Sequence, residues 1–141
     1  MDLIKKLLKN PSYGTGADFA LLLIRIAAGG FMVFGHGWPK LIKIMNGDMQ
    51  FLDPIGLGPE LSLILVFFAE FICGLLILIG LVPRLAAIVL VINMFVILFV
   101  VHISDPFADK ELSYFYFVGY LAVLLAGAGK HSVQYMLSKN K

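Results

Sequence analysis

Glu70 and Arg25 are the residues of this sequence whose type and position most directly suggest chemistry. Glu70 lies in the middle of the apolar run 61–81, and Arg25 is the only basic residue inside, rather than at the edge of, an apolar segment. A carboxylate can relay a proton, and a guanidinium can hold an anion or polarise a carbonyl group. Because a charge in the bilayer centre costs about 2.5–3.5 kcal/mol on insertion scales, each needs a partner or a function. We predict that the two form an ion pair.

Asn93 is expected to join this pair. With a helix rise of 1.5 Å per residue, Arg25, Glu70 and Asn93 fall within roughly 5 Å of one level, each on a different predicted helix. A bundle interior would bring them together. On the first helix, Gly29 and His36 lie on the face of Arg25, and the glycine would let a neighbouring helix or a ligand approach closely.

Other residues are candidates for the same site. Histidine exchanges protons near neutral pH, so His36, at the outer end of its helix, is a third catalytic candidate beside Glu70 and Arg25. Asn93, Trp38, Tyr120 and His102 are candidate substrate-binding residues. No motif for a metal ion is present, and Cys73 is the only cysteine, which excludes an internal disulfide.

Each candidate also has a structural interpretation. The Arg25–Glu70 pair can serve only to fix the order of the helices, and Asn93 can form an interhelical hydrogen bond. His36 can bond a carbonyl at a helix end. Trp38 and His102 suit a membrane interface, and Tyr120, with Tyr114 and Tyr116, suits an aromatic belt. Cys73 suits a packing position.

The composition identifies an integral membrane protein. Hydrophobic residues make up 60% of the 141 residues and charged residues 14%, whereas soluble domains carry about a quarter charged residues. The length predicts a single domain over 1–141. A net charge of +2 is too small to indicate a nucleic-acid-binding protein. The first residues lack a cleavable signal sequence, so we expect the first span to direct insertion.

Four apolar segments are expected to span the membrane as an all-α, antiparallel four-helix bundle. They cover residues 17–36, 61–81, 84–102 and 113–128. An even number of spans places both termini on one side, and that side carries seven basic residues against three on the other. The positive-inside rule then predicts cytoplasmic termini. The outer loop begins with Trp38, and the following residues 39–45 predict a short amphipathic helix at the outer surface.

Read together, these segments resemble the DoxX family of small bacterial and archaeal membrane proteins, over about residues 17–137. The resemblance rests on three stretches, which are LIRI (23–26) with HGWPKL (36–41), AEFICG (69–74) with GLVPRLAA (80–87), and Glu111 with GAGKHSV (127–133). The sequence departs from the family at Ala128 and Gln134, where a proline and an aspartate are usual. The resemblance implies a multi-pass protein of the bacterial or archaeal cytoplasmic membrane.

The resemblance leaves three functions open. Some members are described as the small subunit of a thiosulfate:quinone oxidoreductase, which implies a quinone as possible cofactor and a redox partner subunit. In that case Glu70 would relay a proton and Arg25 would hold its charge. A non-catalytic scaffold or anchor for a partner protein is the alternative. A third function is solute or lipid handling, with an anion such as thiosulfate on the Arg25 face; it would need a homo-oligomer, because four short helices make a narrow pore.

Overall fold

The computed structural model describes residues 11–139, and these residues form helices and connections without any strand. The helical segments, four of them π-helical (η), are α2 (Thr15–Arg25), η1 (Ile26–Gly30), η2 (Met32–Gly37), α3 (Trp38–Met45), α4 (Pro59–Phe67), η3 (Phe68–Cys73), α5 (Gly74–Ile79), α6 (Pro83–Val96), η4 (Ile97–Val101), α7 (Phe107–Ala126) and α8 (Val133–Lys139). The predicted all-helical class is confirmed over this part of the chain.

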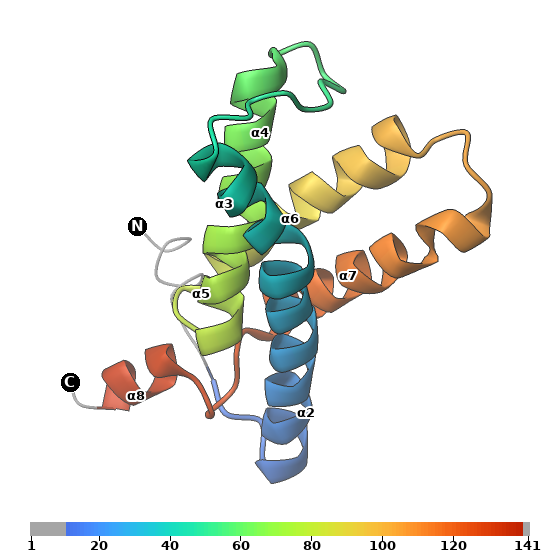
Figure 1. The fold of residues 1–141 in the computed structure, drawn as a ribbon. Helices are drawn as coiled ribbons and strands as arrows, with labels where there is room; N and C mark the ends of the chain where they lie inside the picture. The colour runs from blue at the N-terminus through green and yellow to red at the C-terminus, as the bar shows by residue number, and fades with distance from the viewer. Residues whose placement is uncertain (1–10, 140–141) are drawn as a thin grey trace, which may run out of the picture.

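The long helices form two hairpins (Figure 1). In the first hairpin, the helix from α2 to α3 lies against the returning helix from α4 to α5. In the second hairpin, α6 with η4 packs against α7. The two hairpins meet near the end of α5 and diverge toward their loops. Residues of both hairpins and of their loops line the cavity that belongs to the candidate site.

Prolines and glycines set the helix ends. Pro59 and Pro83 stand in the first turns of α4 and α6, where the missing N–H needs no partner. Gly80, with φ of +71°, ends α5 in the left-handed conformation that glycine adopts easily. Gly127, with φ of +83°, ends α7. The short connection between the predicted segments 61–81 and 84–102 and the predicted helix end near 128 are both found.

Three helical stretches are long and apolar enough to cross a membrane: Thr15–Met45, Pro59–Ile79 and Pro83–Val101. They overlap the first three predicted spans. The first helix, however, runs on through residues 39–45, which were expected to form a separate short helix at the outer surface. The fourth predicted span falls on α7, which starts six residues earlier than expected and carries Asp109, Lys110 and Glu111. The 15 residues after these charges extend only about 22 Å at 1.5 Å per residue, less than the ~30 Å hydrocarbon core. Four-span topology therefore stays a prediction.

The π-helical segments and close glycine contacts shape the first hairpin. A Cβ atom on Gly29 would lie 2.8 Å from the backbone nitrogen of Leu78, and one on Gly37 would lie 2.8 Å from the backbone of Phe71. The predicted close approach at Gly29 is thus present. The wider turns of η2 and η3 shift the side-chain register by part of a turn, which a regular helical pattern does not anticipate.

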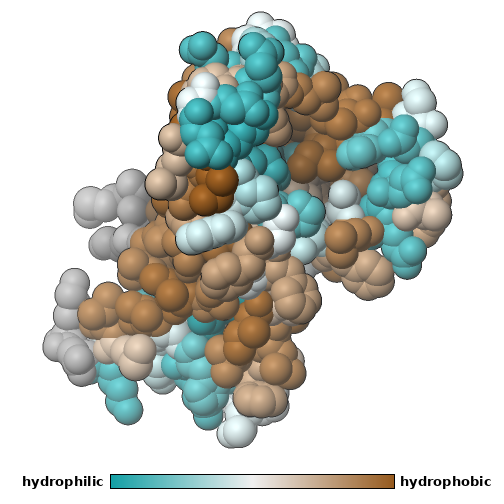
Figure 2. Space-filling model, in the orientation of Figure 1, coloured by the Kyte–Doolittle hydropathy of each residue, from teal (hydrophilic) through white to brown (hydrophobic). Residues whose placement is uncertain are grey.

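The molecular surface separates apolar and polar regions (Figure 2). Hydrophilic residues gather over the loop between α3 and α4 and over the connection between η4 and α7, and apolar residues cover the helices between these regions and the opposite end. Exposed leucine, isoleucine and phenylalanine side chains are spread over every long helix. Such a surface is suited to lipid rather than water.

Candidate functional site

Arg25 and Glu70 do not meet, and the predicted ion pair is wrong. Arg25 is 2% exposed and donates only to backbone carbonyls in the bonds that the structure defines. Nε bonds the carbonyl of Ile77 and Nη2 that of Leu78, each at 2.9 Å. Nη1 bonds Ala128 at 2.9 Å and His131 at 2.7 Å. Ile77 and Leu78 lie two helical turns, about 10 Å, beyond Glu70 along the same helix.

The two side chains separate because their helices run in opposite directions. In an α-helix, each Cα–Cβ bond leans toward the helix N-terminus. Arg25 therefore leans toward the start of α2, and Glu70 leans toward the start of α4, at the other end of the hairpin. Counting rise per residue placed the two Cα atoms near one level. It ignored this opposite lean, which the length of an arginine side chain amplifies.

The carbonyl groups around Arg25 belong to a helix end and a loop, where they need hydrogen-bond donors. Ile77 and Leu78 lie in the last turn of α5, and Ala128 and His131 lie in the loop after α7. The last carbonyls of a helix have no intrahelical partner, and a buried guanidinium supplies several donors at once. We call this group the Arg25 centre. Its geometry is that of a structural tie between the first helix, the second helix and the C-terminal loop.

Asp18 extends the tie to the chain before α2. Its side chain is fully buried in the first turn of α2. It accepts hydrogen bonds from the hydroxyl of Ser12 at 2.6 Å and from the backbone nitrogens of Tyr13 and Lys130, each at 3.2 Å. Asp18 thus fixes the same C-terminal loop that Arg25 holds.

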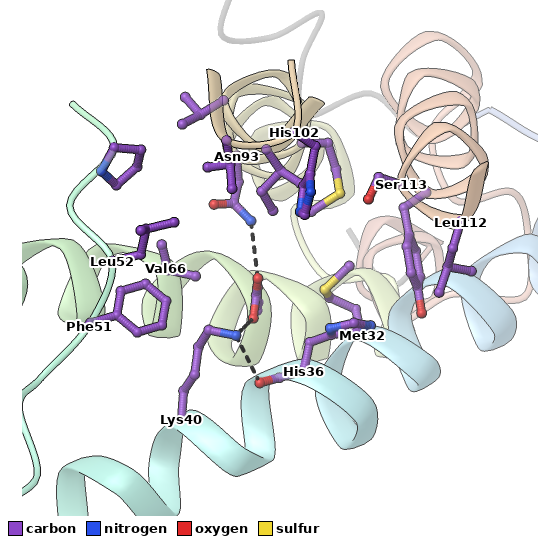
Figure 3. A pocket seen from close by; sticks show the side chains of 17 residues that line it. Met32, His36, Lys40, Phe51, Leu52, Val66, Asn93, His102, Leu112 and Ser113 are labelled. Atoms are coloured by element: carbon purple, nitrogen blue, oxygen red, sulfur yellow. Dashed lines mark hydrogen bonds and ion pairs between the residues drawn. The ribbon is translucent and has the colours of Figure 1, made fainter. Parts of the chain in front are cut away.

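Glu70 instead pairs with Lys40, a residue of α3. The ammonium nitrogen of Lys40 lies 2.6 Å from Oε2 of Glu70, and it also donates to the backbone carbonyl of His36 at 3.3 Å (Figure 3). Asn93 Nδ2 lies 3.5 Å from Oε1 of Glu70, at the long limit of a hydrogen bond. The predicted proximity of Asn93 to Glu70 is therefore present, whereas Arg25 lies elsewhere. Glu70 itself is 3% exposed.

These polar groups border a cavity of about 260 Å³ between the two hairpins, which we call the Glu70 cavity. Its lining residues are Met32, His36, Lys40, Phe51, Leu52, Pro54, Val66, Glu70, Asn93, Met94, Val96, Ile97, Val101, His102, Leu112, Ser113 and Tyr116. Most of the wall is apolar and a few polar groups converge on it, as is usual for small-molecule sites. The figure shows His36 and Met32 on one side and Ser113 and Leu112 on another.

His36 borders the cavity beside Tyr116. The two rings meet edge to face, with centroids 5.7 Å apart and planes at 89°. Tyr116 in turn stacks on Tyr120 with centroids 6.1 Å apart. Tyr116 and Tyr120 are both buried, so they do not form the surface aromatic belt that one interpretation expected. Tyr120 bonds the carbonyl of Ala28 at 3.0 Å and lies behind Tyr116, outside the cavity lining.

Of the two remaining candidate residues, one lines the cavity and the other does not. His102 lines the cavity, and its Nδ1 lies 2.6 Å from Oδ2 of Asp105 in the adjoining loop. Trp38 is half-exposed outside the cavity, with its ring 6.2 Å from that of Phe71. The structure therefore brings Glu70, His36, Asn93 and His102 to one cavity, and it leaves Arg25, Trp38 and Tyr120 outside.

The loop between α3 and α4 covers one side of the cavity with Phe51, Leu52 and Pro54. Asp53 fixes this loop by accepting hydrogen bonds from the backbone nitrogens of Leu57 at 2.8 Å and Gly58 at 2.9 Å, and from Ser62 Oγ at 3.0 Å. The Gly58 N–H is the main cause that holds the pKa of Asp53 below its usual value. The covering loop is thus attached to the start of α4.

Lys40 is the functional candidate that sequence reasoning missed. The sequence places it in the short helix expected over 39–45 and among the outer charges, and gives it no partner. One signal was available: Lys40 follows His36 by four residues, so the two share a face if the helix continues through Gly37 and Pro39. The helix does continue, because η2 passes directly into α3 with helical backbone at Gly37 and Trp38. Among residues 11–139, no group of three or more His, Cys, Asp or Glu side chains could hold a metal ion.

Comparison with known proteins identifies one family. The DoxX family model matches residues 20–103, more than half of the chain. The match includes both residues of the Lys40–Glu70 pair, Arg25 and Asn93, and it ends before α7. No curated protein and no solved structure matches the chain.

Proposed function

Because the chain belongs to the DoxX family of membrane proteins, we propose that it is the membrane subunit of a quinone-linked oxidoreductase and binds a quinone or quinol in the Glu70 cavity. The observation that carries this proposal is the Lys40–Glu70 pair, which lies with Asn93 on the wall of a mostly apolar cavity between two apolar hairpins. Lys40 and Asn93 offer N–H donors, and Glu70 offers an acceptor.

The cavity chemistry suits a ring with oxygen substituents. A quinone presents two carbonyl acceptors on a flat apolar ring, and a quinol presents two hydroxyl groups. The ammonium of Lys40 and the amide of Asn93 can donate to an oxygen atom, and the apolar wall of Met32, Met94 and Ile97 can contact the ring. A volume of about 260 Å³ is near the lower end of ligand sites, which suits one ring rather than a large cofactor.

Protons are the part of the reaction that this chain can handle. Reduction of a quinone to a quinol consumes two electrons and two protons, and the reverse reaction releases them. Glu70 would hold and transfer a proton at a carboxylate oxygen, while Lys40 balances its charge when the proton is absent. His36, between the cavity and the outer end of its helix, would exchange protons with the water outside.

Electrons must come from another component. We propose a redox partner subunit at the outer surface, whose substrate would be a reduced sulfur oxyanion such as thiosulfate, as the family resemblance implies. Oxidation of two thiosulfate ions to one tetrathionate ion yields two electrons, which balances the reduction of one quinone. Arg25 has no part in this scheme, because its guanidinium is occupied by carbonyls.

The membrane arrangement is part of the proposal. We infer that α7 forms a fourth span, that both termini face the cytoplasm, and that the Glu70 cavity lies in the outer half of a bacterial or archaeal cytoplasmic membrane. The concentration of basic residues near the expected inner side supports this orientation. A reporter fused to the C-terminus tests it: activity of a cytoplasmic reporter is expected, and activity of an exported reporter would contradict it.

Binding of a quinone analogue tests the function directly. The protein is reconstituted in lipid nanodiscs, and a decyl-benzoquinone is titrated while protein fluorescence or calorimetric heat is recorded. Glu70→Gln and Lys40→Met are each expected to weaken binding at least about tenfold, the equivalent of one lost charged hydrogen bond. The matched control is Lys43→Met, because Lys43 lies on the same helix but pairs with Asp48 at the surface.

The same assay separates the proposal from a scaffold function. A scaffold predicts that Glu70→Gln lowers the yield of a partner complex in parallel with activity. A variant that assembles stably and loses quinone binding would support the oxidoreductase instead. If the native protein, alone and with its partner subunit, binds no quinone analogue, the proposed function is wrong.

A further inference from the structure

A second cavity adjoins the Glu70 cavity on the lipid-facing side. It measures about 310 Å³ and lies between α4 with η3 and α6. Its lining residues are Pro54, Ile55, Leu57, Ser62, Leu65, Val66, Phe68, Ala69, Val89, Ile92, Asn93 and Val96. Serine and asparagine are the only polar residue types in this lining, and Ser62 Oγ is already bonded to Asp53. We call this second cavity the apolar groove.

The groove and the Glu70 cavity share a boundary. Pro54, Val66, Asn93 and Val96 line both. Asn93 points its amide nitrogen to Glu70 on the cavity side, and its neighbour Ile92 is 59% exposed on the groove side. Two valines, a proline and an asparagine therefore form the common wall between the polar Glu70 cavity and the apolar groove.

The groove also opens outward from the helices. Leu65 and Phe68, on one wall, are each 46% exposed. Ser62 and Ala69 are seven residue steps apart, which is about 10 Å of helix at 1.5 Å per residue. The groove is thus an open trough along two turns of helix rather than a closed core void, and an apolar chain could enter it from the lipid.

We propose that the substrate of the Glu70 cavity is a quinone with a long apolar tail, and that the tail leaves through the apolar groove between Val66 and Val96. This inference rests on the proposed function and specifies its substrate class. The head is neutral, because Lys40 and Glu70 already balance each other and leave no net charge for a phosphate group. A quinone with an isoprenoid or alkyl tail has this combination of a neutral polar ring and an apolar chain.

Asn93 is the positioning residue at the junction. Its amide can donate to a ring oxygen in the cavity, while the adjacent turn of α6 forms the groove wall with Val89, Ile92 and Val96. A tailed ligand would then be held at two places: by its ring between the hairpins and by its tail along the groove between α4 and α6.

The test compares two probes in the native protein in nanodiscs. One probe is decyl-benzoquinone and the other is the same ring with a methyl group in place of the decyl tail. The ratio of their dissociation constants is measured after correction for partition into empty nanodiscs. Ile92→Trp and Leu65→Trp place an indole in the groove, and each is expected to reduce the affinity advantage of the tailed probe about tenfold, since about two buried methylene groups account for that factor.

The matched control is Leu85→Trp. Leu85 lies on the same helix as Ile92 and is also exposed, but it lines neither space. It is expected to leave the ratio within about twofold, since distant lipid-facing substitutions act within about 0.5 kcal/mol. As a second readout, a photoreactive group at the end of the tail should label residues 54–69 and 89–96.

The outcomes separate this inference from the proposed function. A ratio that falls in both groove variants, with labelling of the groove, supports the tail site. Binding of both probes with a ratio that the groove variants do not change, or that Leu85→Trp changes equally, overturns the tail site and leaves the cavity proposal intact. If neither probe binds the native protein, the proposed function fails and the tail site fails with it.

Discussion

The Arg25 centre and the Glu70 cavity are two polar regions in one apolar molecule, and they differ in how their charges are satisfied. Arg25 is surrounded by backbone carbonyls from a helix end and a loop, and it does not line the Glu70 cavity. Glu70 has a side-chain partner, Lys40, and faces an open space. The Arg25 centre holds three chain segments together. The Glu70 cavity leaves room for a ligand.

The difference shows why a buried charge is not by itself evidence of a catalytic site. A guanidinium can satisfy several carbonyls that would otherwise lack donors, so its presence in a membrane protein can be explained by folding alone. A carboxylate accepts only and requires donors, and here a flexible lysine from a different helix supplies one. A lysine–glutamate pair beside a cavity can open and exchange partners, whereas the four carbonyl bonds of Arg25 cannot be replaced by a ligand without loosening three chain segments.

The largest effect is expected for Arg25→Met. The substitution leaves buried carbonyls of α5 and of the loop after α7 without donors, at a cost of about 1–3 kcal/mol for each group that stays buried. We expect at least about 3 kcal/mol of lost stability and a low yield of folded protein, measured by denaturant unfolding in mixed micelles. Arg84→Met, which removes bonds to Leu124 and Leu125 near the surface, should cost less. Normal stability with lost quinone binding in Arg25→Met would contradict a structural role.

Lys40→Met is expected to have the next largest effect on stability. It leaves Glu70 buried without its cation, and breaking a fully buried pair costs about 3–5 kcal/mol. Because Lys40 is partly exposed, we expect about 2 kcal/mol, a value between the buried and the surface range. Lys43→Met on the same helix should change stability by less than about 1 kcal/mol. Equal effects of the two substitutions in unfolding measurements would remove the distinction between the cavity pair and a surface pair.

Gly37→Ala probes the close helix contact beside the cavity. The new Cβ atom would lie 2.8 Å from the backbone of Phe71, the neighbour of Glu70, so the helices must move apart. Overpacking of this kind costs about 1–3 kcal/mol, and we expect weaker quinone binding as well because Glu70 shifts with Phe71. Gly35→Ala is the control, since a Cβ there meets nothing within 4 Å. If Gly35→Ala and Gly37→Ala lower the melting temperature equally, the contact between Gly37 and the backbone of Phe71 is not constrained.

The smallest effect is a pH dependence from Asp53. Its pKa is lowered in the folded protein, mainly by the Gly58 N–H, so the charged form stabilises the loop. This contribution is fully present above the ordinary aspartate range near ~3.9 and is lost as the pH falls through the lowered folded pKa. Asp53→Asn should therefore lower the free energy of unfolding slightly at neutral pH. It should also make that free energy depend less on pH in the acid range. If the substitution leaves the pH dependence of the free energy of unfolding unchanged in the acid range, this carboxylate does not hold the covering loop.

The sequence predicted the helices well because apolar length and proline and glycine positions determine them. The first three apolar helices, the break between residues 81 and 84, the end near residue 128 and the helix over 39–45 follow from such local signals. The start of α7 was placed too late because Asp109, Lys110 and Glu111 resemble a loop by charge, although they form its first turns. Helix α8 was not predicted at all, since seven residues carry too little periodicity.

The candidate site was predicted only in part. Proximity of Asn93 to Glu70 followed from depth counted along the helices. His36 lines the same cavity, although the helix-face argument had grouped it with Arg25. The partner of Glu70 did not follow from the sequence, because side-chain lean and the wider turns of η2 and η3 decide which side chains meet. Neither feature can be read from hydropathy. Lys40 was not linked to Glu70 because the helix expected over 39–45 was placed at the outer surface, apart from the bundle interior.

The most direct test of the account is a pair of double-mutant cycles on the free energy of unfolding in mixed micelles. One cycle combines Glu70→Gln with Lys40→Met, and the other combines Glu70→Gln with Arg25→Lys, which keeps the charge so that the variant can fold. We predict a coupling energy of about 1 kcal/mol or more between Glu70 and Lys40, and additivity within about 0.5 kcal/mol between Glu70 and Arg25. Strong coupling of Glu70 to Arg25 with none to Lys40 would contradict the separation of the two polar regions.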